Sequence, residues 1–356
     1  MTSGDGCNLV EHTENGYFAV TIENDSLSVT ILPGKGADIH RFVSKAHGLD
    51  LLWKSPWHPR RQHGALALAE AGSETAWLDQ YAGGWQWIFP NGGDACIYKG
   101  ASLSFHGEAS VREWDYTVRR CDGSAVEVQF QLATSRGPFH LVRTMRIERG
   151  LPALLLDDTI ENRGEEDMHY MWGHHPAFGA PFLDGGCRLT VPASRFVAHG
   201  TEISKHSRFD PGAAGSWPVV LGKSGVPVDL SVLPPVKDRV TEFGYLSGLD
   251  AGWYALQNDR LNVGFALAWP KEVFPFVWLW EELRGSFGYP WYGRSYVTAF
   301  EPFSSMPGSG LVKAIESGTA PVLNAGAKAG AQVTAVLLTS GHVASVSLDG
   351  TVRLDG

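Results

Sequence analysis

Apolar and polar residues alternate with a period of two along most of this chain. The run YFAVTIENDSLSVTILPGKG (17–36) alternates on both sides of a polar ENDS turn, a pattern typical of a hairpin. Strands that bury one face have this period. Further runs with the same pattern span 125–135, 139–150, 153–164, 187–194, 261–269, 274–282, 296–303, 331–341 and 343–354.

Helical periodicity is nearly absent. One segment, GSETAWLDQYAGG (72–84), predicts a short helix that ends at two glycines. Strands do not alternate with helices, so we expect an all-β fold: one large antiparallel β-sandwich with few short helices, in a single domain over residues 1–356. The segments 54–95 and 195–245 lack the pattern, and we expect them to be long irregular loops that build a site.

Composition narrows the class of protein. Hydrophobic residues make up 44 % and charged residues 19 %, which is typical of a globular protein. A net charge of −9 argues against nucleic acid as a partner, since phosphates require basic surfaces. The basic cluster HPRRQH (58–63) is either a solvated loop or an anion-facing loop at a site rim. The polar N-terminus and the lack of long apolar runs predict no membrane segment and a cytoplasmic protein, monomeric or homodimeric.

Two adjacent histidines stand in MWGHHPAFG (171–179). In a strand, His169 and His175 point to one face and His174 to the other, so the adjacent pair does not chelate one metal ion easily, and we expect no metal. Pro176 is expected to end regular pairing, which would leave His175 at a strand end beside a cleft. Such a histidine is either a general acid or base, or a hydrogen-bonded core residue.

Two more titratable residues occupy comparable positions. His106 in LSFHGEAS precedes a glycine where a strand meets a turn. Glu301 in YVTAFEPFSSMPG lies in an apolar strand and should point the same way as Val297 and Ala299. A buried carboxyl group has a raised pKa, which brings it into the range of a general base.

These motifs together resemble those of the aldose 1-epimerase (galactose mutarotase) family. FPNGGD and LSFHGE, then WGHHPAFG, then YVTAFEPFSSMP occur in the family's order, and the resemblance spans nearly the whole chain. It implies the galactose mutarotase-like supersandwich and no cofactor. It also implies that His175, in a motif with Phe178, is the general acid, that Glu301 is the general base, and that His106 contacts substrate hydroxyls. His174 matches a neighbouring, non-catalytic position.

The chain departs from the family pattern in its substrate-binding residues. Many members have an Asn-Arg pair before the earlier histidine, whereas this chain has FPNGGD, with Asn91 as the nearest polar substitute. The family's substrate-binding aspartate has no clear counterpart, because Asp250 in SGLDAGW has the surroundings of a turn residue. Arg294 in YPWYGRSY is either a surface arginine or an anchor for an anionic group on the sugar.

The expected reaction is interconversion of the α and β anomers of a free or modified hexose. Glu301, as a carboxylate, would accept the proton of the anomeric hydroxyl, and His175, as an imidazolium, would protonate the ring oxygen. Trp280, Trp291 and Phe178 are candidates for a sugar-facing platform. The alternatives are a non-catalytic carbohydrate-binding or sugar-sensing protein, a mutarotase specific for an anionic sugar, and a polysaccharide lyase or hydrolase. A hydrolase would need two carboxylates flanking the bond.

Overall fold

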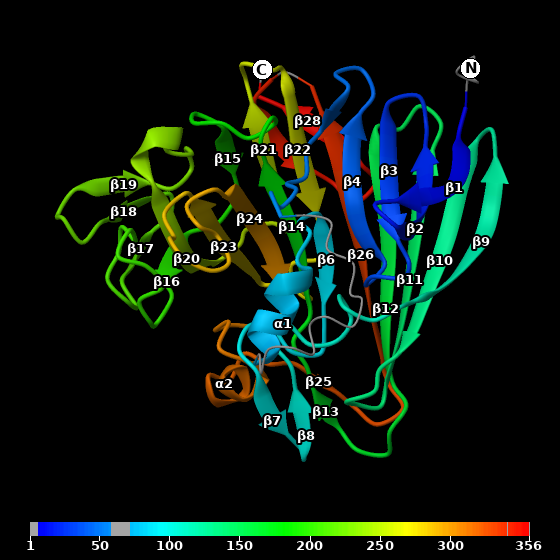
Figure 1. Cartoon of the computed structure of the whole chain (residues 1–356), viewed down its shortest axis with the longest axis horizontal. Helices are drawn as coiled ribbons and strands as arrows, with labels where there is room; N and C mark the ends of the chain where they lie inside the picture. The colour runs from blue at the N-terminus through cyan, green and yellow to red at the C-terminus, as the bar shows by residue number, and fades with distance from the viewer. Residues whose placement is uncertain (1–5, 58–71, 340, 356) are drawn as a thin grey trace.

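Two antiparallel sheets dominate the molecule (Figure 1). The computed structural model describes residues 6–57, 72–339 and 341–355. One sheet has 12 strands and the other has 8, and both are antiparallel, so the predicted all-β sandwich class is confirmed. The single domain over 1–356 stays a prediction, and the basic cluster at 58–63 lies outside the described residues.

The 12-stranded sheet contains the first strands of the chain at one edge and strands from residues 195–247 at the other. In spatial order its strands are β1 (Asn8–Glu14), β2 (Tyr17–Glu23), β3 (Leu27–Leu32), β4 (Asp38–Ser44), β6 (Trp85–Ile88), β14 (Gly173–Gly179), β24 (Tyr296–Phe303), β23 (Phe276–Leu283), β20 (Val240–Ser247), β16 (Arg195–Ala198) and β17 (Ala214–Ser216), with β5 (Leu49–Asp50) paired to β4.

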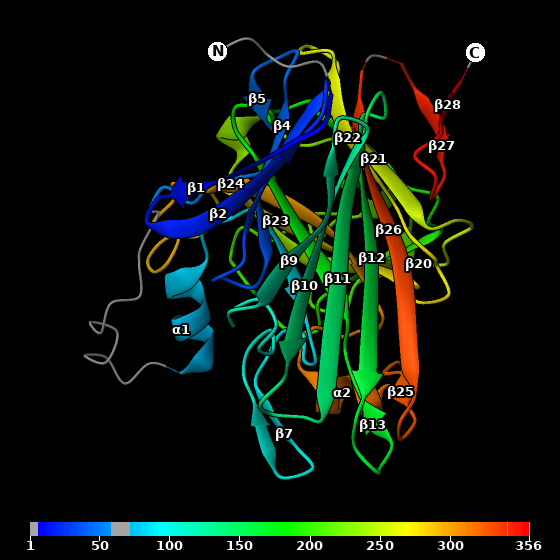
Figure 2. The same cartoon turned by 90° about the vertical axis from the view of Figure 1, so that its right-hand side faces the viewer.

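The 8-stranded sheet holds the longest strands, several of which lie side by side in Figure 2. In spatial order its strands are β15 (Arg188–Thr190), β21 (Trp253–Asn258), β22 (Val263–Ala268), β26 (Lys328–Leu338), β12 (Ala153–Asn162), β11 (Phe139–Glu148), β10 (Ala125–Ala133) and β9 (Asp115–Asp122).

Short hairpins and helices complete the described structure. The two-stranded pairs are β7 (Cys96–Tyr98) with β8 (Ala101–Leu103), β13 (Met168–His169) with β25 (Val322–Leu323), β18 (Val219–Leu221) with β19 (Pro227–Asp229), and β27 (Val343–Val346) with β28 (Val352–Leu354). The helices are α1 (Ser73–Gln80), α2 (Leu311–Glu316) and the 3-10 turn η2 (Val236–Asp238). The helix expected at 72–84 is therefore present as α1. Among the described residues, each helix falls short of what a bilayer crossing requires in length and apolar character.

Aromatic side chains join the two sheets across the core. Phe265 of β22 packs edge-on against Phe42 of β4, with ring centroids 5.1 Å apart, and against Trp85 of β6, at 6.0 Å. Tyr254 of β21 lies 5.9 Å from Phe300 of β24. One face of the large sheet thus packs against the other sheet, and the opposite face can carry a site.

Four strands of the large sheet fall wholly or mostly within segments that were expected to be irregular. β6 lies in 54–95, β16 and β17 lie in 195–245, and β20 begins there. All four residues of β6 are buried, so its sequence, WQWI, shows no alternation between apolar and polar positions. A strand covered on both faces lacks the period-two signal, which is why the sequence pattern missed it.

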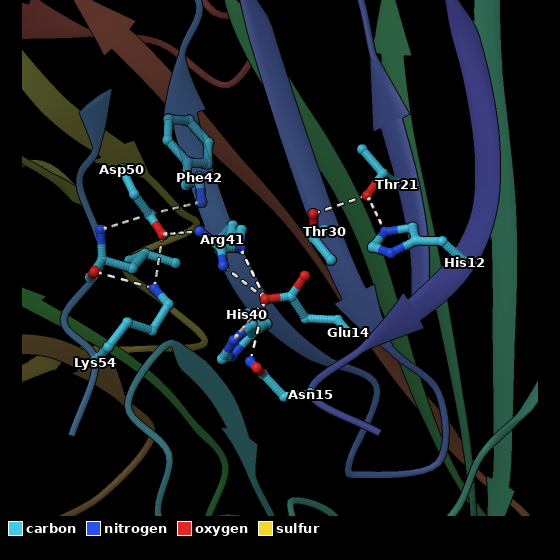
Figure 3. Close-up of polar contacts among 11 residues, drawn as sticks. His12, Glu14, Asn15, Thr21, Thr30, His40, Arg41, Phe42, Asp50 and Lys54 are labelled. Atoms are coloured by element: carbon cyan, nitrogen blue, oxygen red, sulfur yellow. Dashed lines mark hydrogen bonds and ion pairs between the residues drawn. The ribbon is translucent and has the colours of Figure 1, made fainter. Parts of the chain in front are cut away.

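A network of ion pairs ties the edge strands to the turn after β5 (Figure 3). Arg41 of β4 donates from Nη2 to Glu14 Oε1 of β1 at 2.6 Å. The Lys54 ammonium lies 2.8 Å from Asp50 Oδ2. These ion pairs are partly exposed, so each one stabilises the contact between the strands only modestly.

Candidate active site

The face of the large sheet that points away from the second sheet carries the candidate site. In β24, Val297 and Ala299 pack in a cluster on this face, whereas Phe300 belongs to the core between the sheets. Glu301 has the parity of Val297 and Ala299 and lines the cavity on this face, as the alternation predicted. His175 of β14 lines the same cavity.

His175 lies opposite Glu301 on the neighbouring strand. Ala177 of β14 pairs with Ala299 of β24, so the residue two positions before Ala177 faces the residue two positions after Ala299. The two side chains are 3.6 Å apart, from His175 Nε2 to Glu301 Oε1. Their exposed fractions are only 5 % and 2 %. Within the described residues, His175 Nδ1 and Glu301 Oε2 have no hydrogen-bond partner.

A cavity of about 490 Å³ opens above this pair. Helix α1 and the residues around β8 form one wall, and β20 and β23 form another. Aromatic and imidazole rings surround His175: the ring centroid of Tyr81 lies at 5.5 Å, and those of His106 and Trp280 each lie at 5.8 Å. Aromatic rings thus line the base of the cavity, and the unpartnered polar atoms of the pair are available to a ligand.

Burial determines the protonation of the pair. It lowers the pKa of His175 to about 4 and raises the pKa of Glu301 well above the usual range of a carboxyl group. Both shifts favour the uncharged group. These directions favour a neutral His175 and a protonated Glu301, whereas the expected mechanism begins with a carboxylate and an imidazolium. The reason is desolvation, since the 3.6 Å separation is too long for a strong charge-assisted hydrogen bond.

His106 projects into the cavity from the turn after β8. It has a left-handed backbone, with φ of 56°, and its ring packs 4.7 Å from that of Trp77. The backbone N–H of Gly93 donates to His106 Nδ1 at 3.1 Å, so the neutral imidazole carries its hydrogen on Nε2. Burial lowers its pKa well below the ordinary value, which keeps the ring neutral. His106 thus supplies a hydrogen-bond donor.

Gly93 allows the loop that positions His106 to approach its neighbour. Its φ is +72°, and a Cβ there would lie 1.7 Å from the carbonyl oxygen of Gly308. Only glycine fits such a contact between two backbones. Of the expected site-wall stretch PNGGD, Gly93 and Asp94 line the cavity.

His174 points to the opposite face, into the core. The Arg143 guanidinium binds Asp158 there in a two-pronged ion pair, at 2.8 and 2.6 Å. His174 Nε2 lies 3.4 Å from Asp158 Oδ2, and burial lowers its pKa well below the ordinary value. His174 is a structural residue beneath the site, in agreement with the alternation. Strand β14 continues through Pro176 to Gly179, so the expectation that Pro176 ends the pairing was wrong.

Phe178 does not reach the cavity, so its expected role on the sugar-facing platform is not retained. It is fully buried on the core face, where its ring centroid lies 4.9 Å from that of Phe265. The parity of the strand explains this position, because Phe178 shares the face of His174 rather than that of His175. The structure does place Trp280 and Trp291 in the cavity lining, with ring centroids 5.4 Å apart.

Asn91 and Arg294 also lie outside the cavity lining. The Asn91 amide donates to the carbonyl oxygens of Asp94 and Ser104 at 2.8 and 2.9 Å, which commits it to its own loop. Arg294 is exposed, with its guanidinium 5.2 Å from the ring of Trp57. Neither side chain is retained as a sugar ligand.

Asp250 occupies a bend on the surface, which fits the turn residue that its surroundings indicated. Its contacts run through the backbone: its N–H donates to the carbonyl oxygen of Pro192 at 2.8 Å, and its own carbonyl accepts from Lys271 Nζ at 2.8 Å. It does not line the cavity.

Trp77, Tyr81 and His199 are among the cavity residues that were not identified from the sequence. Trp77 and Tyr81 stack at 4.6 Å, and their spacing of four residues at helix α1 places them on one face, a signal that was available. Tyr81 is 3 % exposed, and its hydroxyl has no hydrogen-bond partner among the described residues. His199 follows β16, in a segment without a pattern, so nothing in the sequence pointed to it.

The cavity is acidic. Its lining in the described part of the chain has the carboxyl groups of Glu74, Asp94, Glu282 and Glu301 and no lysine or arginine. In the same residues, no three His, Cys, Asp or Glu side chains cluster in a way that could hold a metal ion.

Comparison with known sequences gives one family. The family described as "Domain of unknown function (DUF4432)" matches residues 14–215. Among curated proteins, no sequence matches this chain.

Solved structures share the fold at low sequence identity. A candidate aldose 1-epimerase of Klebsiella pneumoniae is 18 % identical, with a TM-score of 0.70 over 94 % of this chain and 88 % of that one. A galactose mutarotase-like protein of Clostridium acetobutylicum is 14 % identical, with a TM-score of 0.62 over 94 % of this chain and 99 % of that one. A galactose mutarotase-like protein of Lactobacillus casei is 18 % identical, with a TM-score of 0.59 over 90 % and 99 %. The chain therefore has the galactose mutarotase-like fold.

Proposed function

This chain belongs to the DUF4432 family, and we propose that it is an aldose 1-epimerase that interconverts the α and β anomers of a free, neutral hexose. One observation carries the proposal: a buried histidine and a buried glutamate lie 3.6 Å apart at the base of a cavity of about 490 Å³. The mutarotase-like names of the proteins that share the fold are in keeping with it.

The pair has the composition that mutarotation requires. The reaction removes a proton from the anomeric hydroxyl and adds one to the ring oxygen, so that the ring opens to the aldehyde. Rotation about C1–C2 and reclosure then give the other anomer. Because His175 and Glu301 together hold one proton, they supply one acid and one base. No net proton is gained or lost over the cycle.

The order of proton transfer follows from the bound sugar. With Glu301 as base and His175 as acid, the shared proton must move to the imidazole before the reaction. An anomeric hydroxyl that donates to the Glu301 carboxylate stabilises its charged form, and a ring oxygen that accepts from His175 stabilises the imidazolium. Binding of the substrate thus favours the charged pair, which burial alone disfavours.

The surroundings of the pair suit a pyranose. The Nε2–H of His106 is a donor for a hydroxyl oxygen. Trp280 offers an aromatic face beside His175, against which the C–H face of a sugar ring can pack. The Tyr81 hydroxyl adds a further donor or acceptor next to the reacting atoms.

The charge of the cavity favours a neutral substrate. A sulfonate, carboxylate or phosphate on the sugar would meet four carboxyl groups in the described lining and no cationic side chain. Desolvating an anion without a partner is costly. Arg294, the expected anchor for such a group, lies outside this lining, so we do not favour the anionic-sugar alternative.

Carboxylate spacing argues against a hydrolase. Glu282 is the other fully buried glutamate of the lining, and it pairs in register with Val297, four residues from Glu301 along β24. At about 3.3 Å per residue, Val297 and Glu301 are roughly 13 Å apart along β24, and Glu282 lies beside Val297 on the next strand. Glycoside hydrolases hold their two carboxyl groups about 5–10 Å apart.

The test follows the exchange of anomers directly. A freshly dissolved pure anomer is mixed with the protein, and relaxation to equilibrium is followed by NMR, over a panel of neutral hexoses, hexose phosphates and hexuronates. We expect catalysed exchange for at least one neutral hexose, and little or none for the anionic sugars. Uncatalysed relaxation over the whole panel would contradict the proposal. If a sugar nevertheless bound saturably, the protein would be a non-catalytic sugar-binding protein.

A further inference from the structure

His199 enters the cavity from the wall opposite helix α1. It directly follows β16, and its backbone is held on both sides: its N–H donates to the carbonyl oxygen of Phe243 at 2.9 Å, and its own carbonyl accepts from Gly212 at 3.0 Å. Its ring lies 5.1 Å from that of Phe243 and lines the cavity. The backbone therefore fixes where this imidazole sits.

Two aromatic rings separate His199 from the reacting pair. Phe243 lies 5.7 Å from Trp278, and Trp278 is the register partner of Glu301 on β23. Because His199 and Glu301 line the same cavity, a sugar whose anomeric carbon lies at Glu301 can present its more distant oxygens to His199.

A chain of hydrogen bonds sets the tautomer of His199. The backbone N–H of Gly308 donates to the Tyr245 hydroxyl oxygen at 2.8 Å. That hydroxyl also contacts His199 Nδ1. Because the Tyr245 oxygen already accepts from Gly308, we infer that its hydroxyl donates to His199 Nδ1. A neutral His199 then carries its hydrogen on Nε2, on the other side of the ring from Tyr245.

This arrangement repeats that of His106 on the other wall. There, too, a backbone N–H of a glycine, Gly93, determines which nitrogen is the acceptor. The loops that carry Gly93 and Gly308 touch each other: the backbone N–H of Asp94, the residue after Gly93, donates to the carbonyl oxygen of Gly308 at 3.4 Å. One pair of touching loops thus aligns two imidazoles that line the same cavity. Burial lowers the pKa of His199, which keeps its ring neutral.

We propose that His199 determines sugar specificity by donating from Nε2 to one hydroxyl oxygen remote from the anomeric carbon, and that Tyr245 is its positioning residue. This inference rests on the proposed function and adds a second contact to it. The neutral hexose is bound at C1 by the His175–Glu301 pair and at a distant hydroxyl by His199.

The test is a panel of monodeoxy hexoses, each lacking one hydroxyl of the best substrate. For wild type, we expect kcat/KM to fall about tenfold for the sugar that lacks the hydroxyl bound by His199, because a partly buried donor is left unpaired. In His199→Ala, the full hexose and this deoxy sugar should have about equal kcat/KM, whereas discrimination against the other deoxy sugars remains. His199→Gln, whose amide nitrogen can take the place of Nε2, should restore part of the lost preference.

His12→Ala is the matched control. His12 is also a partly buried histidine bonded to a hydroxyl, Thr21 Oγ1 at 2.8 Å, but it lies on edge strand β1 (Figure 3). Its deoxy-sugar profile should equal that of wild type. If His199→Ala keeps every preference of wild type while anomer exchange persists, the inference fails and the proposed function stands. If wild type exchanges no anomers, the proposed function fails, and the same panel is read as dissociation constants to decide the role of His199.

The positioning role of Tyr245 has its own readout. In wild type, ¹⁵N NMR of the His199 imidazole should give an unprotonated Nδ1 and a protonated Nε2. Tyr245→Phe should shift the His199 ring toward a mixture of tautomers and lower kcat/KM severalfold. The order of preference among the deoxy sugars should stay the same. Tyr116→Phe is the control: it removes a phenol on β9 of the 8-stranded sheet that donates to Glu11 of β1. A protonated Nδ1 in wild type would overturn the assignment.

Discussion

His175 and Glu301 face each other across neighbouring strands, with Nε2 of the imidazole 3.6 Å from Oε1 of the carboxyl group. Strand alternation brings both side chains to one face, and the antiparallel register brings them to one level. Burial then makes them a one-proton pair, which is the smallest unit that can act as acid and base together.

Replacing the base tests this pair most directly. We expect Glu301→Gln to lower kcat for anomer exchange by about 10²–10⁴-fold, the usual contribution of one acid–base group. His175→Ala should have an effect of similar size. Glu316→Gln, on the exposed side of α2, is the control and should retain wild-type activity. Thermal unfolding checks that each variant folds. A fully active Glu301→Gln would refute the assigned mechanism.

The pH profile of kcat/KM should be a broad bell. His175 has a lowered pKa of about 4, so below that pH it gains a proton, the pair holds two protons, and no base remains. Glu301 has a raised pKa, so above it the pair holds no proton and no acid remains. We expect an acid limb near pH 4 and a plateau through neutral pH, measured by NMR exchange from pH 3 to 9. An acid limb near pH 6.5 would show that His175 titrates as an exposed histidine does.

Removing the Tyr81 hydroxyl should separate stability from activity. In the described structure this buried hydroxyl has no partner, so Tyr81→Phe should leave the free energy of unfolding unchanged or raise it by about 1 kcal/mol. Activity should nevertheless fall about tenfold, because the hydroxyl lies next to the reacting pair. Tyr254→Phe is the matched control: its buried hydroxyl is also unpartnered, but its ring lies in the core between the sheets. Urea unfolding and anomer exchange rates are measured on both variants. If Tyr81→Phe is as active as Tyr254→Phe, the Tyr81 hydroxyl has no role in the reaction.

The ion pair beneath His174 should be essential to the fold. Asp158→Asn leaves the Arg143 guanidinium buried without its counter-ion, and we expect a loss of about 3–5 kcal/mol in the free energy of unfolding. Asp157→Asn is the same substitution one residue earlier on the exposed face of β12, and it should change stability by less than about 0.5 kcal/mol. Urea denaturation compares the two. Similar losses would indicate that the buried pair contributes no more than a surface charge.

The strands with one covered face were predictable because alternation records which face is covered. The expected strand 296–303 matches β24 residue for residue, and the hairpin around residues 24–26 is β2 and β3. The same alternation correctly separated His174 from His175. It missed β6, whose four residues are all buried, because a strand covered on both faces has no polar side.

The sequence by itself thus determined the fold class, the helix at α1 and the candidate residues His106, His175 and Glu301. Periodicity and motif order suffice for those features because they are local. The tertiary structure alone decided which neighbours these residues have. Phe178 packs in the core and Asn91 bonds to its own loop, whereas Tyr81 and His199 line the cavity. The tertiary structure also decided where the shared proton lies, because desolvation depends on what the whole chain packs around a group and not on the residues beside it in sequence.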